Sequence, residues 1–391
     1  MKLTRRLLQL AFLVLTLVGV YVFQGHAERW CPFGGVEAIY TYVNDGNLTC
    51  SLGVSNFYIL GAVLLITLLL RRAFCSYACP IGTISEWLSQ IARKLGIRQL
   101  RVPPTLDRVL GLLKYPVLAI ILYITWRAGE LLFRGFDPCY ALISRHGTDI
   151  TFWAYVVAGA IVLASLIVVL PFCRWLCPLA AVMSPFSAIG LARVRRHADA
   201  CVDCGLCTRV CPMGIAVDKA RDVTAARCTA CLECVAACPK TRDGAMSWGP
   251  PKWLGGRWSQ AVLVVVLLAC LGGAVAATYV CPLPSFMQAH GEAPARVAAC
   301  SLRVKGVSCR HSSIQFVEWV TRTGDGVPGY VKVEAWPGPE FAPVRITYDP
   351  TITSESQIKR AIVSPTIDLL DGTVTYSTYE IEGYTPSVDD L

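Results

Sequence analysis

Five apolar stretches divide the first 280 residues of the chain. They cover residues 7 to 23, 52 to 70, about 109 to 126, 150 to 172 and 258 to 280. Each approaches the roughly 20 residues that an α-helix needs to cross about 30 Å of hydrocarbon. The third contains Lys114, whose long side chain can reach the membrane interface from near a helix end. The pattern predicts an all-α membrane core of about five transmembrane helices.

A different pattern follows the fifth stretch. Four segments alternate in polarity as strands do, and two have helical spacing. The strands are "SLRVKGV" (301–307), "YVKVEA" (330–335), "VRITYD" (344–349) and "TVTYSTYEI" (373–381), and the helices are "SIQFVEWVTR" (313–322) and "SESQIKRAI" (354–362). Their order, βαββαβ, is that of the ferredoxin-like split sandwich, so we predict an α+β C-terminal domain of this fold.

Composition and charge place the chain in a membrane. Hydrophobic residues make up 54% and charged residues 16%, whereas soluble domains average about a quarter charged. The net charge of +9 could suggest nucleic acid, but Lys and Arg collect in alternate loops. Residues 71 to 114 hold eight and residues 172 to 257 hold twelve, while residues 24 to 56 hold only Arg29. The positive-inside rule then predicts a multi-pass protein of the cytoplasmic membrane, with both basic segments in the cytoplasm and everything after residue 281 outside. No nucleic-acid partner is needed.

The first apolar stretch has two interpretations. "MKLTRR", an apolar run and "GHA" also fit a signal peptide cleaved after Ala27. The next loop fits an anchored hairpin as well, and the topology downstream is the same in both cases.

Two cysteine-rich blocks carry the strongest chemical signal. "CVDCGLCTRVCP" (201–212) and "CTACLECVAACP" (228–239) both read C-x2-C-x2-C-x3-C-P. This is the run of bacterial two-cluster ferredoxins, in which the fourth cysteine binds the other cluster. The pattern therefore predicts two [4Fe-4S] clusters with crossed ligand sets. Cluster 1 takes Cys201, Cys204, Cys207 and Cys238, and cluster 2 takes Cys228, Cys231, Cys234 and Cys211.

Other uses of these cysteines fit less well. Zinc sites usually show paired C-x2-C units rather than four-cysteine runs that end in proline. Disulfides are disfavoured on the reducing, cytoplasmic side. We interpret Asp203 and Glu233, which lie between the cysteines, as solvated loop residues rather than ligands.

A second repeat lies in the membrane segment. "RRAFCSYACPIGTISEW" (71–87) and "LPFCRWLCPLAAVMSPF" (170–186) share the motif F-C-x3-C-P, each after a pair of spans. Cysteines four apart share a helical face, which predicts that Cys75 acts with Cys79 and Cys173 with Cys177. Four converging thiols could bind a further cluster or metal or act as redox dithiols. Alternatively, they are small buried residues.

Further cysteines fall on the predicted outer side. Cys31, Cys139 and Cys281 are candidate redox thiols, and Cys31 and Cys139 hold equivalent places in the two repeats. A simple disulfide between Cys31 and Cys50 is at least as good an interpretation.

Residues 1 to about 280 resemble the membrane-bound polyferredoxins of the NapH/MauN type, which share a membrane module with NosR-like proteins. The resemblance rests on "CPFGGVEA", both F-C-x3-C-P motifs, "RVRRHADACVDCGLCTRVCPMGI" and "CTACLECVAACP". It implies two [4Fe-4S] clusters on the cytoplasmic side. It also implies electron transfer between a quinone pool or cytoplasmic donor and an extracytoplasmic redox system.

The C-terminal segment resembles a heavy-metal-associated domain, from "LRVKGVSC" through "ITYDPTITSESQIKRAI". That family binds soft metals through two thiolates in a G-M-T-C-x2-C loop. Here the loop is "GVSCRHSS", in which Cys309 matches the first ligand and Ser312 replaces the second. Cys300 or His311 could substitute, or Cys309 could be a redox thiol. Our leading interpretation is a degenerate docking or structural domain.

These observations define four expected regions. They are a membrane module (1–190), a dicluster ferredoxin domain (191–250), a fifth transmembrane helix (251–282) and an extracytoplasmic domain (283–391). The expected function is membrane-bound iron–sulfur electron transfer, with redox partner proteins and a quinone or quinol. One alternative is a metal-handling or assembly factor that reduces or delivers a copper-like ion through the C-terminal domain. A weaker one is thiol exchange through the C-x3-C-P motifs.

Overall fold

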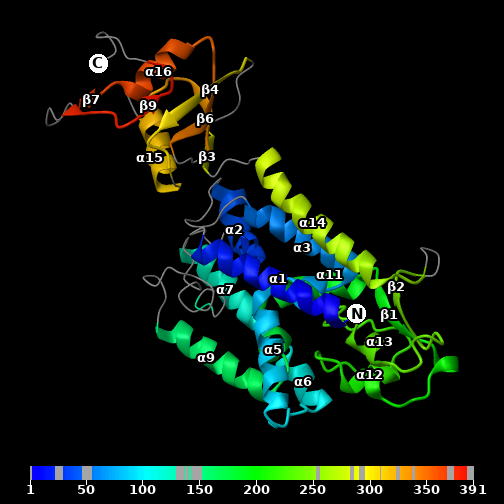
Figure 1. Cartoon of the computed structure of the whole chain (residues 1–391). Helices are drawn as coiled ribbons and strands as arrows, with labels where there is room; N and C mark the ends of the chain where they lie inside the picture. Colours follow the sequence, from blue (N-terminus) through cyan, green and yellow to red (C-terminus); the bar gives the residue numbers. More distant parts are fainter. Residues whose placement is uncertain are drawn as a thin grey trace. The chain divides into compact units, whose positions relative to one another are not determined.

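The computed structural model describes most of the chain as two compact units (Figure 1). The described residues are 2–22, 30–45, 55–128, 137, 141, 152–251, 256–281, 286–289, 296–308, 310–322, 326–336, 340–367 and 374–384. One unit comprises Met1–Glu37 with Ser55–Ala277, and the other comprises Ala38–Val54 with Thr278–Leu391. Helix α2 (Pro32–Asp45) begins in the first unit and ends in the second.

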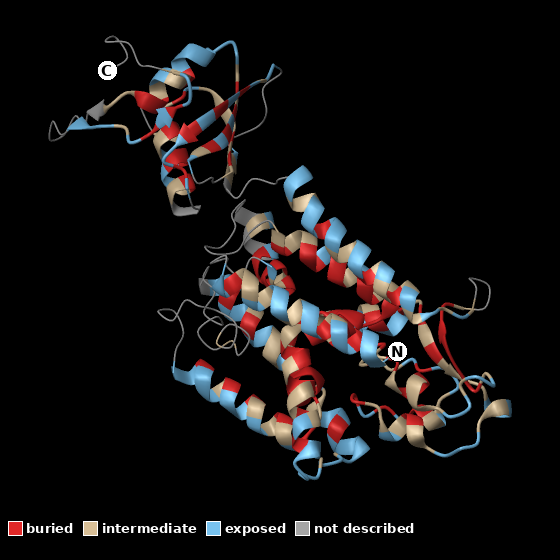
Figure 2. Ribbon diagram, viewed as in Figure 1, coloured by how far each residue is buried: buried red, intermediate tan, exposed pale blue. Residues whose placement is uncertain are grey.

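Each predicted apolar stretch overlaps a helix of the structure. These helices are α1 (Lys2–Tyr21), α3 (Ser55–Leu70), α7 (Lys114–Ala128), α9 (Phe152–Ile167) and α14 (Gln260–Val280). Among the described residues, three segments are long and apolar enough to cross a membrane: Lys2–Tyr21, Pro104–Arg127 and Gln260–Val280. Figure 2 shows exposed residues along α1, α9 and α14, as expected for apolar helices that face lipid rather than a protein core.

The other helices of the first unit are shorter. They are α4 (Ala73–Tyr77), α5 (Pro80–Lys94), α6 (Pro104–Leu110), α10 (Pro171–Trp175), α11 (Pro178–Ile189), α12 (Leu206–Arg209) and α13 (Glu233–Ala237), with the 3-10 turns η4 (Ala198–Ala200) and η5 (Val217–Lys219).

The two C-x3-C-P motifs form matching corners rather than faces of continuous helices. After α3 and α9 the chain turns at a left-handed residue, Arg71 (φ 58°) or Leu170 (φ 53°), and a five-residue helix follows. The second cysteine of each motif then caps the next helix, whose first residue is the motif's proline. Proline is favoured at that position, where its missing N–H group costs no helical hydrogen bond. The prediction that each cysteine pair shares one helical face is therefore wrong. The predicted span at 150–172 is also too long, because α9 ends at Ile167 before Pro171.

Each repeat packs one of its helices on the other repeat. Helix α5 of the first repeat packs on α9 of the second, and α11 of the second packs on α3 of the first. Equivalent hydrogen bonds complete both contacts. The N–H of Leu100 donates to the carbonyl of Ile167 (2.8 Å), and the N–H of Ala192 donates to that of Leu69 (3.0 Å). This reciprocal packing brings the two corners to the same end of the bundle.

The cysteine-rich segment is held by a short ribbon. Strand β1 (Arg193–Arg196) pairs antiparallel with β2 (Met246–Gly249), with Arg193 opposite Gly249. Figure 1 shows this ribbon, α12 and α13 beside the N-terminal end of α1. One hydrophobic core runs from membrane-helix residues such as Ile66 and Met183 to Met213 and Val223 of the insert.

The second unit contains a five-stranded antiparallel sheet in the order β3-β5-β6-β4-β9. Its strands are β3 (Phe286–Ala289), β4 (Ala298–Lys305), β5 (Tyr330–Ala335), β6 (Phe341–Tyr348) and β9 (Glu380–Ile381). Helices α15 (Arg310–Thr321) and α16 (Glu355–Val363) complete it, and β7 (Thr366–Ile367) pairs separately with β8 (Val374–Thr375). Apart from the separate β7–β8 pair, the order from β4 to β9 is βαββαβ, and β3 adds a strand to the sheet. The ferredoxin-like assignment remains a prediction.

Gly82 is required for the close approach within the first corner. A Cβ on Gly82 would lie 2.5 Å from the carbonyl oxygen of Cys75, whereas one on Gly61 would meet nothing within 4 Å. We expect Gly82→Ala to cost about 1–3 kcal/mol through overpacking, seen as a lower midpoint of thermal unfolding in detergent. Gly61→Ala is the matched control and should be neutral or stabilising. Equal midpoints for the two variants would contradict this packing.

Candidate functional site

The eight cysteines of the two blocks line two separate cavities. The first is lined by Cys201, Cys204, Cys207 and Cys238, together with Arg196, Val202, Asp203, Gly205, Leu206, Asp218 and Met246. The second is lined by Cys211, Cys228, Cys231 and Cys234, together with Val194, Met213, Ile215, Val217, Val223, Thr229, Ala230 and Leu232. The structure thus groups the cysteines as in the crossed sets, while their ligation of iron remains a prediction.

The loops around the two cavities have the same backbone turns. Asp203 (φ 47°) and Gly205 (φ 65°) are left-handed in the first loop, and Ala230 (φ 48°) and Leu232 (φ 59°) are left-handed at the equivalent places in the second. Left-handed non-glycine residues are uncommon and gather at functional sites. Turns of this kind make concave nests of N–H groups, which are typical of iron–sulfur sites. The donor set and the loops therefore fit a thiolate-bound cluster.

The two cavities differ in their exposure. In the first, Cys204 is exposed and the side chain of Asp203 is 79% accessible. In the second, Cys228 and Cys234 are each 8% exposed. Burial raises the pKa of the Cys231 thiol to about 12, with the charge of Arg5 acting in the opposite direction. A thiolate is disfavoured there without nearby positive charge, which iron supplies on coordination.

The first C-x3-C-P corner holds the second cavity through buried hydrogen bonds. The guanidinium of Arg71 donates to the carbonyl oxygens of Val223 (3.3 Å) and Thr224 (2.8 Å). The backbone N–H of Arg72 donates to the carbonyl of Cys228 (3.4 Å), and the hydroxyl of Ser76 donates to that of Thr229 (3.0 Å). Both arginines are at most 1% exposed. The loop of the second cavity is therefore anchored to the membrane helices.

The second corner reaches the same cavity through a carboxylate. Asp107 is 2% exposed. It accepts hydrogen bonds from Arg174 (2.6 Å), Trp175 (2.8 Å) and, through its other oxygen, Arg227. Arg227 also donates to the carbonyl of Gly214 (3.3 Å), which lies three residues after Cys211. The two corners thus contact the second cavity from two segments of its loop.

The four C-x3-C-P thiols lie close enough together for the ionisation of one thiol to affect the others. Cys173 interacts electrostatically with the other three, and Cys75 and Cys177 also interact with the guanidinium of Arg72. Within the described part of the chain, no group of three or more His, Cys, Asp or Glu side chains is arranged to hold a single metal ion. This holds for the ferredoxin cysteines as well. A cubane is wider than an ion, so its ligands stand further apart.

The remaining predicted site residues are Cys31, Cys139, Cys281 and Cys309. Cys139 and Cys309 lie outside the described residues. Cys31 is half-buried, and burial raises the pKa of its thiol to about 12. Cys281 is exposed and belongs to the other compact unit.

The two charged residues between the cysteines differ from each other in exposure. Asp203 is exposed, as expected of a solvated loop residue. The interpretation of Glu233 as solvated is wrong, because its side chain is 21% exposed and pairs with the buried Arg5. The sequence reasoning also missed the role of Asp107. Its position beside an apolar stretch, like that of Lys114 inside one, was the available signal for a buried charged residue.

Comparisons with known proteins agree with this architecture. A family model described as a 4Fe-4S binding domain matches residues 52–98 and again 150–196, the two corner repeats. A second, described as a 4Fe-4S dicluster domain, matches residues 193–239.

Several curated proteins are similar over most of their length. YccM of Escherichia coli K12, whose name assigns it to electron transport, is 32% identical over 66% of this chain and 76% of its own length. An uncharacterised protein of Methanocaldococcus jannaschii is 30% identical over 54% and 83%. The ferredoxin-type protein NapH of Haemophilus influenzae is 26% identical over 60% and 85%. No solved structure matches this chain.

The grouping of the cysteines makes a prediction about single substitutions. We expect Cys211→Ser and Cys231→Ser to abolish the same electron paramagnetic resonance (EPR) signal, and Cys238→Ser to abolish the other, because a serine removes one thiolate from its own cavity. The spectra of dithionite-reduced, full-length variants test this. Loss of one and the same signal in Cys231→Ser and Cys238→Ser would show an uncrossed arrangement.

Proposed function

Since this chain belongs to the NapH/MauN/NosR-type membrane ferredoxins, we propose a specific route for the electrons that it transfers. The chain is a membrane-bound iron–sulfur electron-transfer protein. In the proposed route, electrons pass between a solvent-facing cluster 1 and a cluster 2 that lies against the membrane helices. The clusters supply the one-electron chemistry.

The proposed ligands follow the two cavities. Cluster 1 is assigned to the first cavity and cluster 2 to the second, with the crossed cysteine sets given above. The exposed Cys204 favours cluster 1 as the place where a soluble redox protein exchanges electrons. The observation that carries the route is the anchoring of the cluster 2 loop to both corners by Arg71, Arg72 and Asp107.

Charge balance supports a further centre at the C-x3-C-P thiols. Arg72 and Lys114 are 1% and 7% exposed. Neither pairs with a carboxylate in the described part of the chain, although Arg5 and Arg174 do. Buried cations require nearby negative charge, which neutral thiols or disulfides do not provide. Cys177 interacts electrostatically with both cations. A third cluster, bound by Cys75, Cys79, Cys173 and Cys177, would supply the missing anion.

The proposed topology keeps five membrane crossings. Helices α3 and α9 have 16 residues each and would span about 24 Å, so they need the corner segments or a locally thinner bilayer to complete the crossing. The clusters then lie on the cytoplasmic side of the inner membrane, and a quinone or quinol is the proposed partner within the lipid.

For the C-terminal unit, we propose a ferredoxin-like docking domain on the extracytoplasmic side. The hydroxyl of Ser312 accepts a hydrogen bond from the backbone N–H of Ser308 (2.9 Å). Ser312, which replaces the second thiolate ligand of heavy-metal-associated domains, thus stabilises the loop. That contact favours a structural role over two-thiolate metal binding.

The order of the centres can be tested by removing cluster 2 alone. In Cys211→Ser protein in liposomes, we expect cluster 1 still to accept electrons from dithionite in water. Its reoxidation by quinone in the membrane should slow at least about tenfold, because the connecting centre is lost. Absorption changes after rapid mixing provide the measurement. The control is Cys270→Ser, which alters a half-buried cysteine of α14 that has no assigned redox role. Unchanged reoxidation in Cys211→Ser would exclude the proposed order.

The third centre makes a prediction about iron content. We expect about 12 iron atoms per chain in the reconstituted protein and about 8 in Cys173→Ser, since each cubane holds four. Cys270→Ser, which alters a half-buried cysteine of α14, should keep the full complement. About 8 iron atoms in all three proteins would rule out a cluster at the corners.

A further inference from the structure

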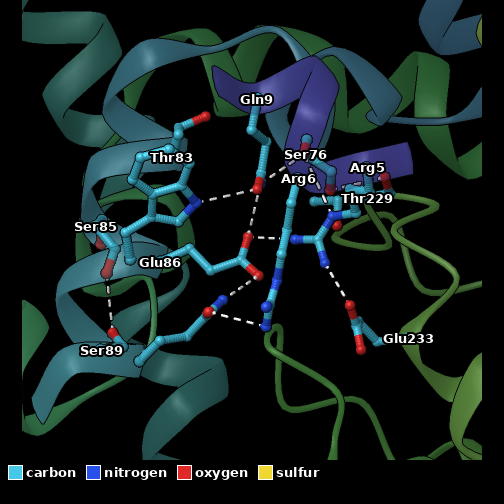
Figure 3. Close-up of polar contacts among 12 residues, drawn as sticks. Arg5, Arg6, Gln9, Ser76, Thr83, Ser85, Glu86, Ser89, Thr229 and Glu233 are labelled. Atoms are coloured by element: carbon cyan, nitrogen blue, oxygen red, sulfur yellow. Dashed lines mark hydrogen bonds and ion pairs between the residues drawn. The ribbon is translucent and has the colours of Figure 1, made fainter. Parts of the chain in front are cut away.

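Arg5, in the first turns of α1, reaches the loop of cluster 2. Figure 3 shows its guanidinium between two carboxylates from distant parts of the chain. Nη1 pairs with Oε1 of Glu233 at 2.8 Å, and Nη2 pairs with Glu86 of α5. Nε donates to the carbonyl of Ser76 at 3.4 Å. Arg5 is 3% exposed, so its charge is poorly screened by water or salt.

The surroundings of Arg5 hold it in this position. The side-chain amide of Gln9 donates to Glu86 (3.0 Å) and to the carbonyl of Ser76 (3.0 Å), and its oxygen accepts from the indole of Trp87 (3.2 Å). Figure 3 shows these contacts joining α1 to α5 and to the loop that carries Glu233. The charge is thus fixed by side chains of three separate elements.

The position of Glu233 links this network to cluster 2. Glu233 is the first residue of α13 and lies between Cys231 and Cys234. Arg5 and Cys231 are within electrostatic range of each other. The equivalent position in the first cysteine block is Leu206, which cannot form this ion pair. The first cavity has an ion pair between Arg196 and Asp203 (2.8 Å) instead, but the side chain of Asp203 is 79% accessible, so water screens that pair more strongly.

One-electron reduction adds a negative charge to the cluster without forming or breaking a covalent bond. A fixed cation nearby stabilises the reduced form and raises the reduction potential, whereas a fixed carboxylate lowers it. Both effects are larger in a buried site than in water, because the surroundings reorganise less.

We propose that Arg5 is a positioning residue that sets the reduction potential of cluster 2. The cation raises this potential, and Glu233 moderates the rise. Cluster 2 thereby becomes a better acceptor of the single electron that leaves reduced cluster 1. The inference rests on the proposed function, namely on cluster 2 being bound by Cys211, Cys228, Cys231 and Cys234.

A potentiometric EPR titration of the full-length protein tests this. We expect Arg5→Gln to shift the midpoint of cluster 2 to more negative potential and Glu233→Gln to shift it to more positive potential. The midpoint of cluster 1 should not move in either variant. Arg6→Gln is the matched control, because Arg6 is the next residue of α1, is exposed, and donates only to the side-chain oxygen of Gln90 (3.2 Å) in the described structure.

Arg5→Lys separates tuning from simple support of the fold. It keeps the charge but loses the forked geometry of the guanidinium, so its midpoint should stay near the wild-type value. If Arg5→Gln fails to hold cluster 2, Arg5→Lys and Glu233→Gln still decide the matter. The inference is overturned if Glu233→Gln leaves the midpoint unchanged, or if Arg5→Lys moves it as far as Arg5→Gln. Absence of both cluster signals in the wild-type protein would instead refute the proposed function.

Discussion

The structure depends on the way buried arginines of the membrane corners bind the backbone of the cysteine-rich insert. A buried guanidinium is costly unless its N–H groups are bonded. Arg71 meets much of this need with the carbonyl oxygens of residues 223 and 224, and Arg72 meets part of it with that of residue 226, although Nε of Arg71 and Nη2 of Arg72 have no partner among the described residues. The carbonyls are thereby held in place, and with them the loop that leads to Cys228. The cysteine-rich insert and the membrane helices consequently share one core, and the loop of the second cavity is fixed against these helices.

The duplication gives this anchoring its two-sided form. The repeats match in their left-handed turn, short helix, cysteine cap and helix-starting proline, and their helices pack reciprocally. They differ in how they contact the insert. The first corner uses arginine–carbonyl bonds, whereas the second uses Asp107 as a shared acceptor between Arg174 and Arg227. The two repeats therefore contact the cysteine-rich insert differently, because each repeat faces a different segment of the same loop.

Local spacing predicted the chemistry, and long-range contacts decided the rest. The cysteine rhythm was enough to group eight residues into two sets, since the motif itself specifies the crossing. Apolar runs located the membrane helices but not their ends, because Pro171 stops α9 earlier than hydropathy suggests. The role of Glu233 was not predictable from the sequence. Its partner Arg5 lies 228 residues away, and no local sequence pattern predicts an ion pair over that distance. The one available signal was that Arg5 is a charged residue beside an apolar stretch.

The two proposed clusters share one ligand motif but have different surroundings. One lies beside an exposed loop, and the other is enclosed by membrane helices and buried arginines. The most direct test of that central claim measures EPR relaxation in the reduced, full-length protein with a water-soluble dysprosium chelate. The chelate speeds the spin relaxation of clusters that lie close to water. We expect the signal lost in Cys238→Ser to relax markedly faster when the chelate is added, and the signal lost in Cys231→Ser to change little. Equal acceleration of both signals, or a larger effect on the second, would contradict the account.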